Sequence, residues 1–159
     1  MLAIAWSFAQ PTIESLLSAP FPSSITTSPD GKKVAWVFNK EGVRNIWLAT
    51  GSSLKARSLT SFTADDGIDI TSLTFSPDGK SLLFVKGNDA NGAGENANPA
   101  RLQTPVAPAV YFLSTEKGDP VKIEEGSSPS FAPDGKSFAF VSHGQVFMAS
   151  TDSLKATKL

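Results

Sequence analysis

The chain has 159 residues, which is enough for one domain with a hydrophobic core. Its formal net charge is −1, from 14 basic and 15 acidic residues, so we expect no nucleic-acid partner and no binding to an anionic membrane surface. It contains no cysteine, which excludes disulfides and thiolate metal sites but leaves its compartment open.

The N-terminus is apolar from Met1 to Phe8, but this run is far shorter than the roughly 20 residues of a membrane-spanning helix. Residues 7–9, Ser-Phe-Ala, resemble a signal-peptide cleavage site. A basic front region is absent, because the first basic residue is Lys32. We interpret residues 1–9 as the remnant of a signal peptide that starts upstream, which predicts a periplasmic or secreted protein. The alternative is an apolar N-terminus that packs on the fold.

Residues 10–22 form a lead-in to the repeated part of the chain. Thr12 predicts the N-cap of a short helix that ends at Leu17, with Glu14 in its first turn. The prolines at positions 20 and 22 are expected to stop this helix.

One five-residue phrase then occurs three times, as Ser28-Pro29-Asp30-Gly31-Lys32, Ser76-Pro77-Asp78-Gly79-Lys80 and Ala132-Pro133-Asp134-Gly135-Lys136. In each copy proline presets φ at the first corner of a turn, aspartate binds nearby amides, and glycine supplies a positive φ. An apolar run follows each copy, which predicts a hairpin connection between two strands. Repeated units at this spacing are typical of propellers and solenoids.

Three β-units are therefore predicted, at about residues 23–62, 68–125 and 126–159. The expected strands lie at 24–27, 33–39, 45–50, 57–60, 70–75, 82–86, 110–114, 121–123, 128–132, 137–142, 145–150 and 156–159. Residues 87–108 form one long irregular segment, and loops of this length are usually functional or mobile.

The apolar run Val34 to Phe38 has no polar alternation, which predicts a strand covered on both faces. Four strands per unit and cover on both faces are typical of propeller blades. The predicted fold is all-β: a partial β-propeller, residues 23–159, of about three four-stranded antiparallel blades after a short N-terminal helix.

The repeated phrase resembles the propeller repeat of TolB and of the prolyl-oligopeptidase-like serine peptidases. Residues 13–22, 34–39 and 42–47 resemble more specifically the N-terminal end of secreted bacterial dipeptidyl-peptidase or acylaminoacyl-peptidase relatives. The resemblance covers roughly residues 13–159. In that family a propeller of seven or eight blades caps a C-terminal α/β-hydrolase domain that carries the catalytic Ser, Asp and His.

The sequence departs from this family because it contains no hydrolase domain and no G-x-S-x-G nucleophile elbow. The single histidine, His143, falls in a predicted hairpin turn without a nucleophile and an orienting group, so we interpret it as a polar loop residue. Glu124 and Glu125 lie at an inter-blade connection and do not match the family's carboxylates that hold a substrate amino terminus. We assign no catalytic residue to the chain.

Two weak motifs fall in the long irregular segment. Residues 92–97 match G-x-G-x-x-A, but no strand–helix unit surrounds them and Pro99 would stop a helix. Residues 89–100 faintly resemble a calcium loop, but Ala93 and Ala100 stand where oxygen ligands are needed. We therefore expect no cofactor and no metal.

Elsewhere, Asp65, Asp66 and Asp69 are interpreted as a solvated turn between blades. Trp36 and Trp47 are interpreted as core residues rather than as ligand platforms.

Three blades cannot close a ring, because propellers close with about four to eight. We expect the chain to be the N-terminal piece of a longer protein, its ring completed by further blades or by a partner chain. An isolated chain should be marginally stable or should self-associate. The favoured function is to gate and position peptide substrates for a serine-peptidase domain. The alternative is a TolB-like periplasmic protein-binding propeller without enzymatic activity.

Overall fold

The computed structural model describes residues 12–89, 91–93, 95, 98, 101, 103, 105–116 and 118–159. The expected signal-peptide remnant at residues 1–9 lies outside them, as do parts of the irregular segment 87–108. Within the described residues, no helix is long and apolar enough to cross a membrane.

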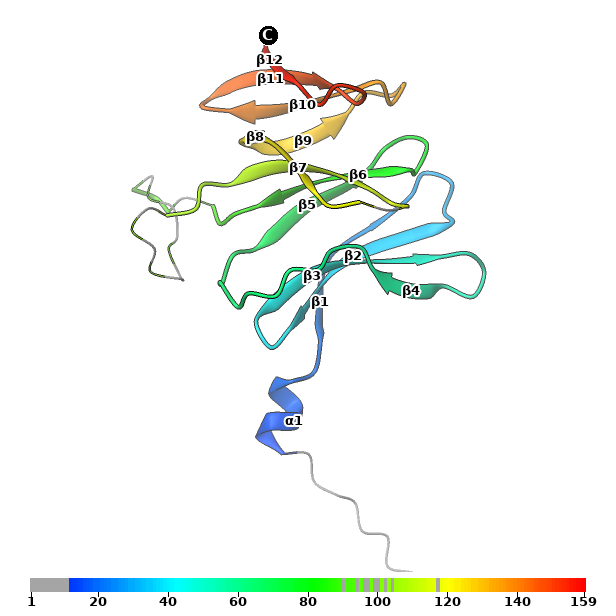
Figure 1. The fold of residues 1–159 in the computed structure, drawn as a ribbon, viewed down its shortest axis with the longest axis vertical. Helices are drawn as coiled ribbons and strands as arrows, with labels where there is room; N and C mark the ends of the chain where they lie inside the picture. Colours follow the sequence, from blue (N-terminus) through cyan, green and yellow to red (C-terminus); the bar gives the residue numbers. More distant parts are fainter. Residues whose placement is uncertain are drawn as a thin grey trace, which may run out of the picture.

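The described part of the chain begins with a short helix, α1 (Ile13–Leu17). The hydroxyl of Thr12 accepts a hydrogen bond from the Ser15 amide at 3.1 Å, which confirms the predicted N-cap. The helix projects beyond the first sheet, at the end of the molecule opposite the C-terminus (Figure 1).

Twelve strands follow within the described residues, in three four-stranded antiparallel sheets. The first sheet contains β1 (Phe21–Thr27), β2 (Lys33–Lys40), β3 (Val43–Thr50) and β4 (Lys55–Ser58). The second contains β5 (Ile70–Phe75), β6 (Ser81–Lys86), β7 (Ala109–Ser114) and β8 (Val121–Glu125). The third contains β9 (Ser127–Phe131), β10 (Ser137–Ser142), β11 (Gln145–Ser150) and β12 (Ala156–Lys158).

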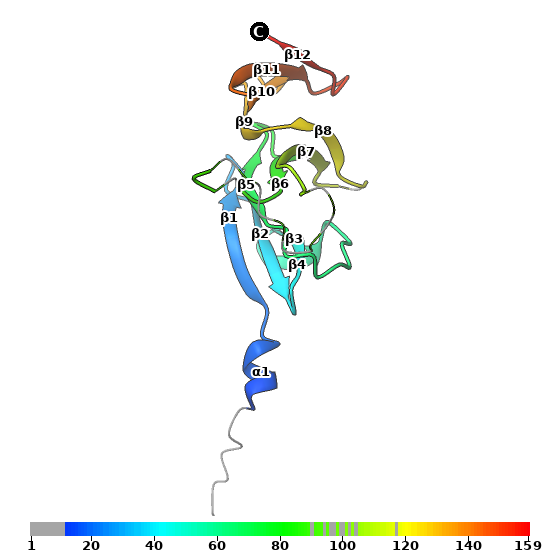
Figure 2. The same ribbon diagram turned by 90° about the vertical axis from the view of Figure 1, so that its left-hand side faces the viewer.

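The strands of each sheet pair in the order in which they occur along the chain. The three sheets stack face to face (Figure 1), and the first strands β1, β5 and β9 follow one another along one side of the stack (Figure 2). This arrangement confirms the predicted partial β-propeller of three four-stranded blades.

The first core lies between the first and second sheets. Alternate residues of β2 and β3 form what we call the leading face of the first sheet: Ala35, Val37, Ile46 and Leu48. They pack against what we call the trailing face of the second sheet, from β6 and β7: Leu82, Phe84, Tyr111 and Leu113. Small or aliphatic side chains thus meet larger, partly aromatic ones.

The second core repeats this arrangement one sheet further along. The leading face of the second sheet consists of Leu83, Val85, Val110 and Phe112. It packs against the trailing face of the third sheet, which consists of Phe138, Phe140, Phe147 and Ala149. Strand β6, in the middle sheet, is consequently buried on both faces.

The apolar run of β2 is covered on only one face in this chain. Ala35 and Val37 are fully buried against the second sheet, whereas Val34, Trp36 and Phe38 are only half-buried on the opposite face. The prediction of cover on both faces is therefore wrong for β2, because no sheet in the described part of the chain lies beyond the first one.

Candidate functional site

The three repeated turns have the geometry that their residues predict. Gly31, Gly79 and Gly135 have φ values of 70°, 68° and 70°, and each amide donates to the carbonyl three residues earlier at 2.9 Å. In each turn the aspartate Oδ1 accepts the amide two residues later, at 3.0–3.1 Å. These turns connect β1 to β2, β5 to β6 and β9 to β10.

The first two turns have two additional hydrogen bonds, made by a serine hydroxyl. The hydroxyl of Ser76 donates to Asp78 at 2.7 Å and accepts from the Ser81 amide at 2.9 Å. These bonds lower the pKa of the Asp78 carboxyl, first through Ser76 and then through the Lys80 amide. Ser28 makes the same two bonds in the first turn. The third turn has Ala132 at this position and keeps its shape without them.

The first two sheets are bridged at the end of the stack that carries these turns. The ammonium of Lys33 donates to the Gly79 carbonyl at 2.7 Å and to the Thr115 hydroxyl at 3.2 Å. The guanidinium of Arg57 donates to the carbonyls of Thr115 and Glu116. Two cationic side chains of the first sheet therefore donate hydrogen bonds to backbone carbonyls in the segments that connect strands of the second sheet.

A pocket of about 310 Å³ lies at the opposite end of these sheets, between β1 and β5. An ion pair between Arg44 Nε and Asp69 Oδ1, 2.9 Å apart, forms part of its wall, and the Asp69 side chain is 54% exposed. Ser24 and Asn39 also line it, and the Ser24 hydroxyl donates to the Ile70 carbonyl at 3.3 Å. The pocket presents both charges and uncharged hydrogen-bonding groups beside the first strands of two blades.

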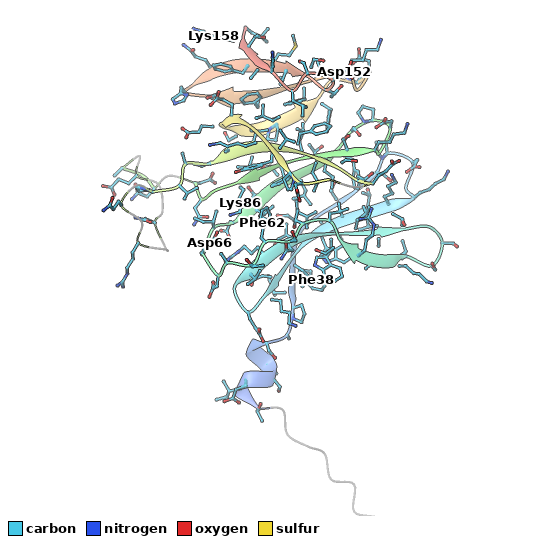
Figure 3. All side chains as sticks on the ribbon, viewed as in Figure 1. Phe38, Phe62, Asp66, Lys86, Asp152 and Lys158 are labelled. Atoms are coloured by element: carbon cyan, nitrogen blue, oxygen red, sulfur yellow. The ribbon has the colours of Figure 1, made fainter. Side chains whose placement is uncertain are left out.

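Two of the three aspartates of the turn between the first two sheets, Asp66 and Asp69, form ion pairs rather than lying free in solvent. Asp69 lines this pocket, whereas Asp66 pairs with Lys86 Nζ at 3.1 Å, and that ammonium lies 5.1 Å from the ring centroid of Phe62 (Figure 3). Burial opposes ionisation of Asp66, but hydrogen bonds from the Ile68 amide and Lys86 outweigh it and lower the pKa of the carboxyl.

The sequence reasoning missed a feature of the first strands. Ser24, Ser72 and Ser128 have φ values of 50°, 55° and 55°, in the left-handed region. At each one the pairing register with the next strand shifts, as in a β-bulge. Each serine lies four residues before the first residue of the repeated phrase, and this recurrence is the signal that could have revealed the bulges.

His143 lies in the turn between β10 and β11, as expected. Its Nδ1 lies 2.9 Å from the hydroxyl of Ser142, which is 2% exposed. An open pocket of about 410 Å³ includes both residues together with Asp89 and Glu125. Within the described residues the imidazole bonds neither carboxylate, so the arrangement of a nucleophile, base and orienting acid is not assembled here.

In the described part of the chain, no three His, Cys, Asp or Glu side chains lie together in a group that could hold a metal ion. In the segment compared with a calcium loop, Asn91 Oδ1 accepts the amides of Ala93 and Glu95, so it closes a turn. Glu125 Oε1 lies 3.9 Å from Lys122 Nζ, in an ion pair between exposed side chains. The remaining positions of residues 89–100 lie partly outside the described ones.

Trp36 and Trp47 belong to an aromatic cluster on the face of the first sheet that points away from the second sheet. Their ring centroids lie 6.5 Å apart, and Phe38 lies 5.9 Å from Trp36 and 5.7 Å from Trp47 in edge-on contact. Open grooves of about 480 and 400 Å³ run along this face. The two tryptophans are half-buried, so they are not core residues in this chain.

No family model and no curated protein matches this chain. Solved structures do match its fold. TolB from Acinetobacter baumannii is 21% identical with a TM-score of 0.55, over 86% of this chain and 31% of that one. An acylaminoacyl peptidase from Pyrococcus horikoshii is 19% identical with a TM-score of 0.57, over 87% of this chain and 25% of that one.

The β-propeller domain of the Trilobed protease from Pyrococcus furiosus, described as having an open velcro topology, is 16% identical with a TM-score of 0.56. That match covers 88% of this chain and 43% of the other. The chain therefore spans between a quarter and less than half of the length of these structures. The likeness shows the fold: this chain is a three-bladed part of a β-propeller.

Proposed function

We propose that the chain is the non-catalytic propeller part of a periplasmic or secreted serine peptidase, where it gates and positions peptide substrates for a hydrolase domain. The pocket between β1 and β5 is the observation that carries this proposal. In a propeller the first strands of the blades face the central channel, so in a closed ring a pocket between β1 and β5 would lie beside that channel.

The chemistry of the pocket suits a short peptide. A peptide carries an ammonium or carboxylate at its ends and amide donors and acceptors between them. The exposed Asp69 carboxylate can bind an ammonium, Arg44 a carboxylate, and Ser24 and Asn39 the amides. The likeness to an acylaminoacyl peptidase and to a protease propeller supports the same choice of ligand.

Binding of short peptides to the purified chain tests this proposal. In an NMR titration with di- and tripeptides that have free termini, we expect shifts confined to the amides around Ser24, Arg44 and Asp69. Asp69→Asn should weaken the binding of peptides with a free amino terminus more than that of N-acetylated ones. Asp119→Asn, at an exposed position of the loop before β8, is the matched control. A titration without localised shifts would contradict the proposal.

Hydrolysis is a separate test. Because the chain contains no nucleophile elbow, it should not cleave aminoacyl or dipeptidyl nitroanilides. Cleavage by the pure chain would contradict the proposal that a separate hydrolase domain carries the catalytic residues.

A TolB-like propeller that binds proteins is the second candidate, and the likeness to TolB from Acinetobacter baumannii favours it. It predicts no response to short peptides but saturable binding of a folded protein partner. The same titration therefore separates the two functions.

A further inference from the structure

Asp69, whose carboxylate lines the pocket between β1 and β5, lies at the end of the connection between β4 and β5. This connection is held by the side-chain amide of Asn88, which follows β6. The Asp69 amide donates to Asn88 Oδ1 at 2.7 Å, and Asn88 Nδ2 donates to the Gly67 carbonyl at 3.1 Å. One side chain therefore uses both its acceptor and its donor on two nearby points of the connection.

The two residues before Asn88 hold the same connection. The Gly87 amide donates to the Asp69 carbonyl at 3.0 Å, so both backbone groups of Asp69 are bonded. The Lys86 ammonium lies 3.1 Å from Asp66 Oδ2, at the other end of the connection's last turn (Figure 3). Three consecutive residues therefore fix the backbone that carries the pocket's carboxylate.

Arg44 faces this carboxylate from the first sheet and is itself held in place. Its Nε lies 2.9 Å from Asp69 Oδ1, and its Nη1 donates to the Gly42 carbonyl at 2.9 Å. The Arg44 side chain is only 20% exposed, whereas that of Asp69 is 54% exposed. Because the carboxylate is the accessible partner of the pair, its position decides where a ligand ammonium would bind.

The third sheet has an acidic residue at the same place but does not hold it in this way. Counted from the repeated phrase, Glu125 corresponds to Asp69 and Gly144 corresponds to Asn88. Glycine has no side chain to accept an amide, and the Glu125 amide donates instead to Glu124 Oε1 at 3.1 Å. The bond from Asn88 is therefore not a requirement of the blade architecture.

We propose that Asn88 is a positioning residue of the peptide pocket. It holds the Asp69 carboxylate where that group accepts the free amino terminus of a peptide, and so sets a preference for free over blocked termini. This inference rests on the proposed function. Asn88 is not among the residues that line the pocket, so it acts through Asp69 and not through the ligand.

Hydrogen exchange of the Asp69 amide tests the contact without any ligand. In the full 159-residue chain, Asn88→Ala should speed this exchange by at least about fivefold, the value of one lost hydrogen bond. The amides of β5 and β6 should keep their exchange rates, which shows that the variant is folded. An unchanged rate at Asp69 would overturn the proposal.

Peptide selectivity tests the role in the pocket, with trialanine and N-acetyl-trialanine as the probes in NMR titrations. Asn88→Ala should raise the dissociation constant of trialanine by about 5–10-fold, because the charge-assisted bond to its ammonium is misplaced. The acetylated peptide has no ammonium and should bind as before. Asn91→Ala is the matched control, because Asn91 Oδ1 also accepts two amides, but those of Ala93 and Glu95 in its own segment. It should change neither dissociation constant.

A double-mutant cycle shows whether Asn88 acts through Asp69. In the Asp69→Asn background, Asn88→Ala should cause no further loss of trialanine binding, since the group that it positions is already gone. Additive losses, or equal losses for both peptides, would refute the positioning role while leaving peptide binding itself in place. If the parent chain binds neither peptide, the proposed function fails, and the role of Asn88 in peptide selectivity fails with it.

Discussion

At the residue scale, we expect the serine that begins a repeated turn to stabilise the folded protein. Ser76 is 4% exposed, and its hydroxyl both donates to Asp78 and accepts from the Ser81 amide. We expect Ser76→Ala to lower the free energy of unfolding by about 1–2 kcal/mol, because hydrogen bonds to Asp78 and to an amide are lost. Urea unfolding measures this.

The third turn provides the reciprocal experiment. Ala132 occupies the same position, and Asp134 already accepts the Lys136 amide there at 3.0 Å. Ala132→Ser should therefore raise the free energy of unfolding by about 0.5–1.5 kcal/mol, the value of an added hydrogen bond. A destabilised Ala132→Ser variant would show that the third turn differs from the first two in more than this hydroxyl.

The depressed pKa of Asp78 predicts how acid affects the fold. A carboxyl whose pKa is lower in the folded state than its ordinary value of 3.8 stabilises the protein at pH values above 3.8. This contribution disappears as the pH falls through the folded-state pKa. Asp78→Asn should therefore be less stable than the parent at pH 6, with a difference that shrinks towards pH 2. Thermal unfolding at several pH values measures this, with Asp152→Asn as the control in an exposed turn.

At the scale of elements, Lys33 is expected to hold the first sheet to the second. Its ammonium donates to the Gly79 carbonyl, in the turn between β5 and β6, and to the Thr115 hydroxyl, directly after β7. Lys33→Met keeps the length of the side chain but removes both bonds, and should cost about 1.5–3 kcal/mol in chemical unfolding. The neighbouring Lys32→Met is the control, because the Lys32 side chain is exposed. Equal effects of the two changes would contradict a specific bridge.

The elements themselves were largely predictable, because each repeated turn marks where the next strand begins. The predicted bounds of β5, β10 and β11 agree with the structure to the residue. The first strand begins earlier than predicted, at Phe21. Pro22 is tolerated there because β1 is an edge strand of its sheet. The fourth strand ends before Thr60, whose hydroxyl bonds the Ile46 amide and Asn45 instead.

The pocket between β1 and β5 was not predictable in the same way. Arg44 lies on β3, Asp69 precedes β5 and Ser24 lies in a bulge of β1, so the site forms only when two blades pack together. No local pattern links residues that far apart. The repeated serine before each turn was readable, but its left-handed backbone appears only in the folded sheet.

At the scale of the whole molecule, cover by neighbouring sheets should decide which strands open last. Residues Leu82 to Val85 of β6 are at most 3% exposed, because both faces of their sheet are covered. β2 likewise has a paired strand on each side within its sheet, yet one of its faces is not covered by another sheet. In native-state hydrogen exchange on dilute protein, the amides of β6 and β7 should therefore exchange most slowly, and those of β2, β3, β10 and β11 faster. Equal protection of all three sheets in dilute solution would mean that face cover does not limit their opening.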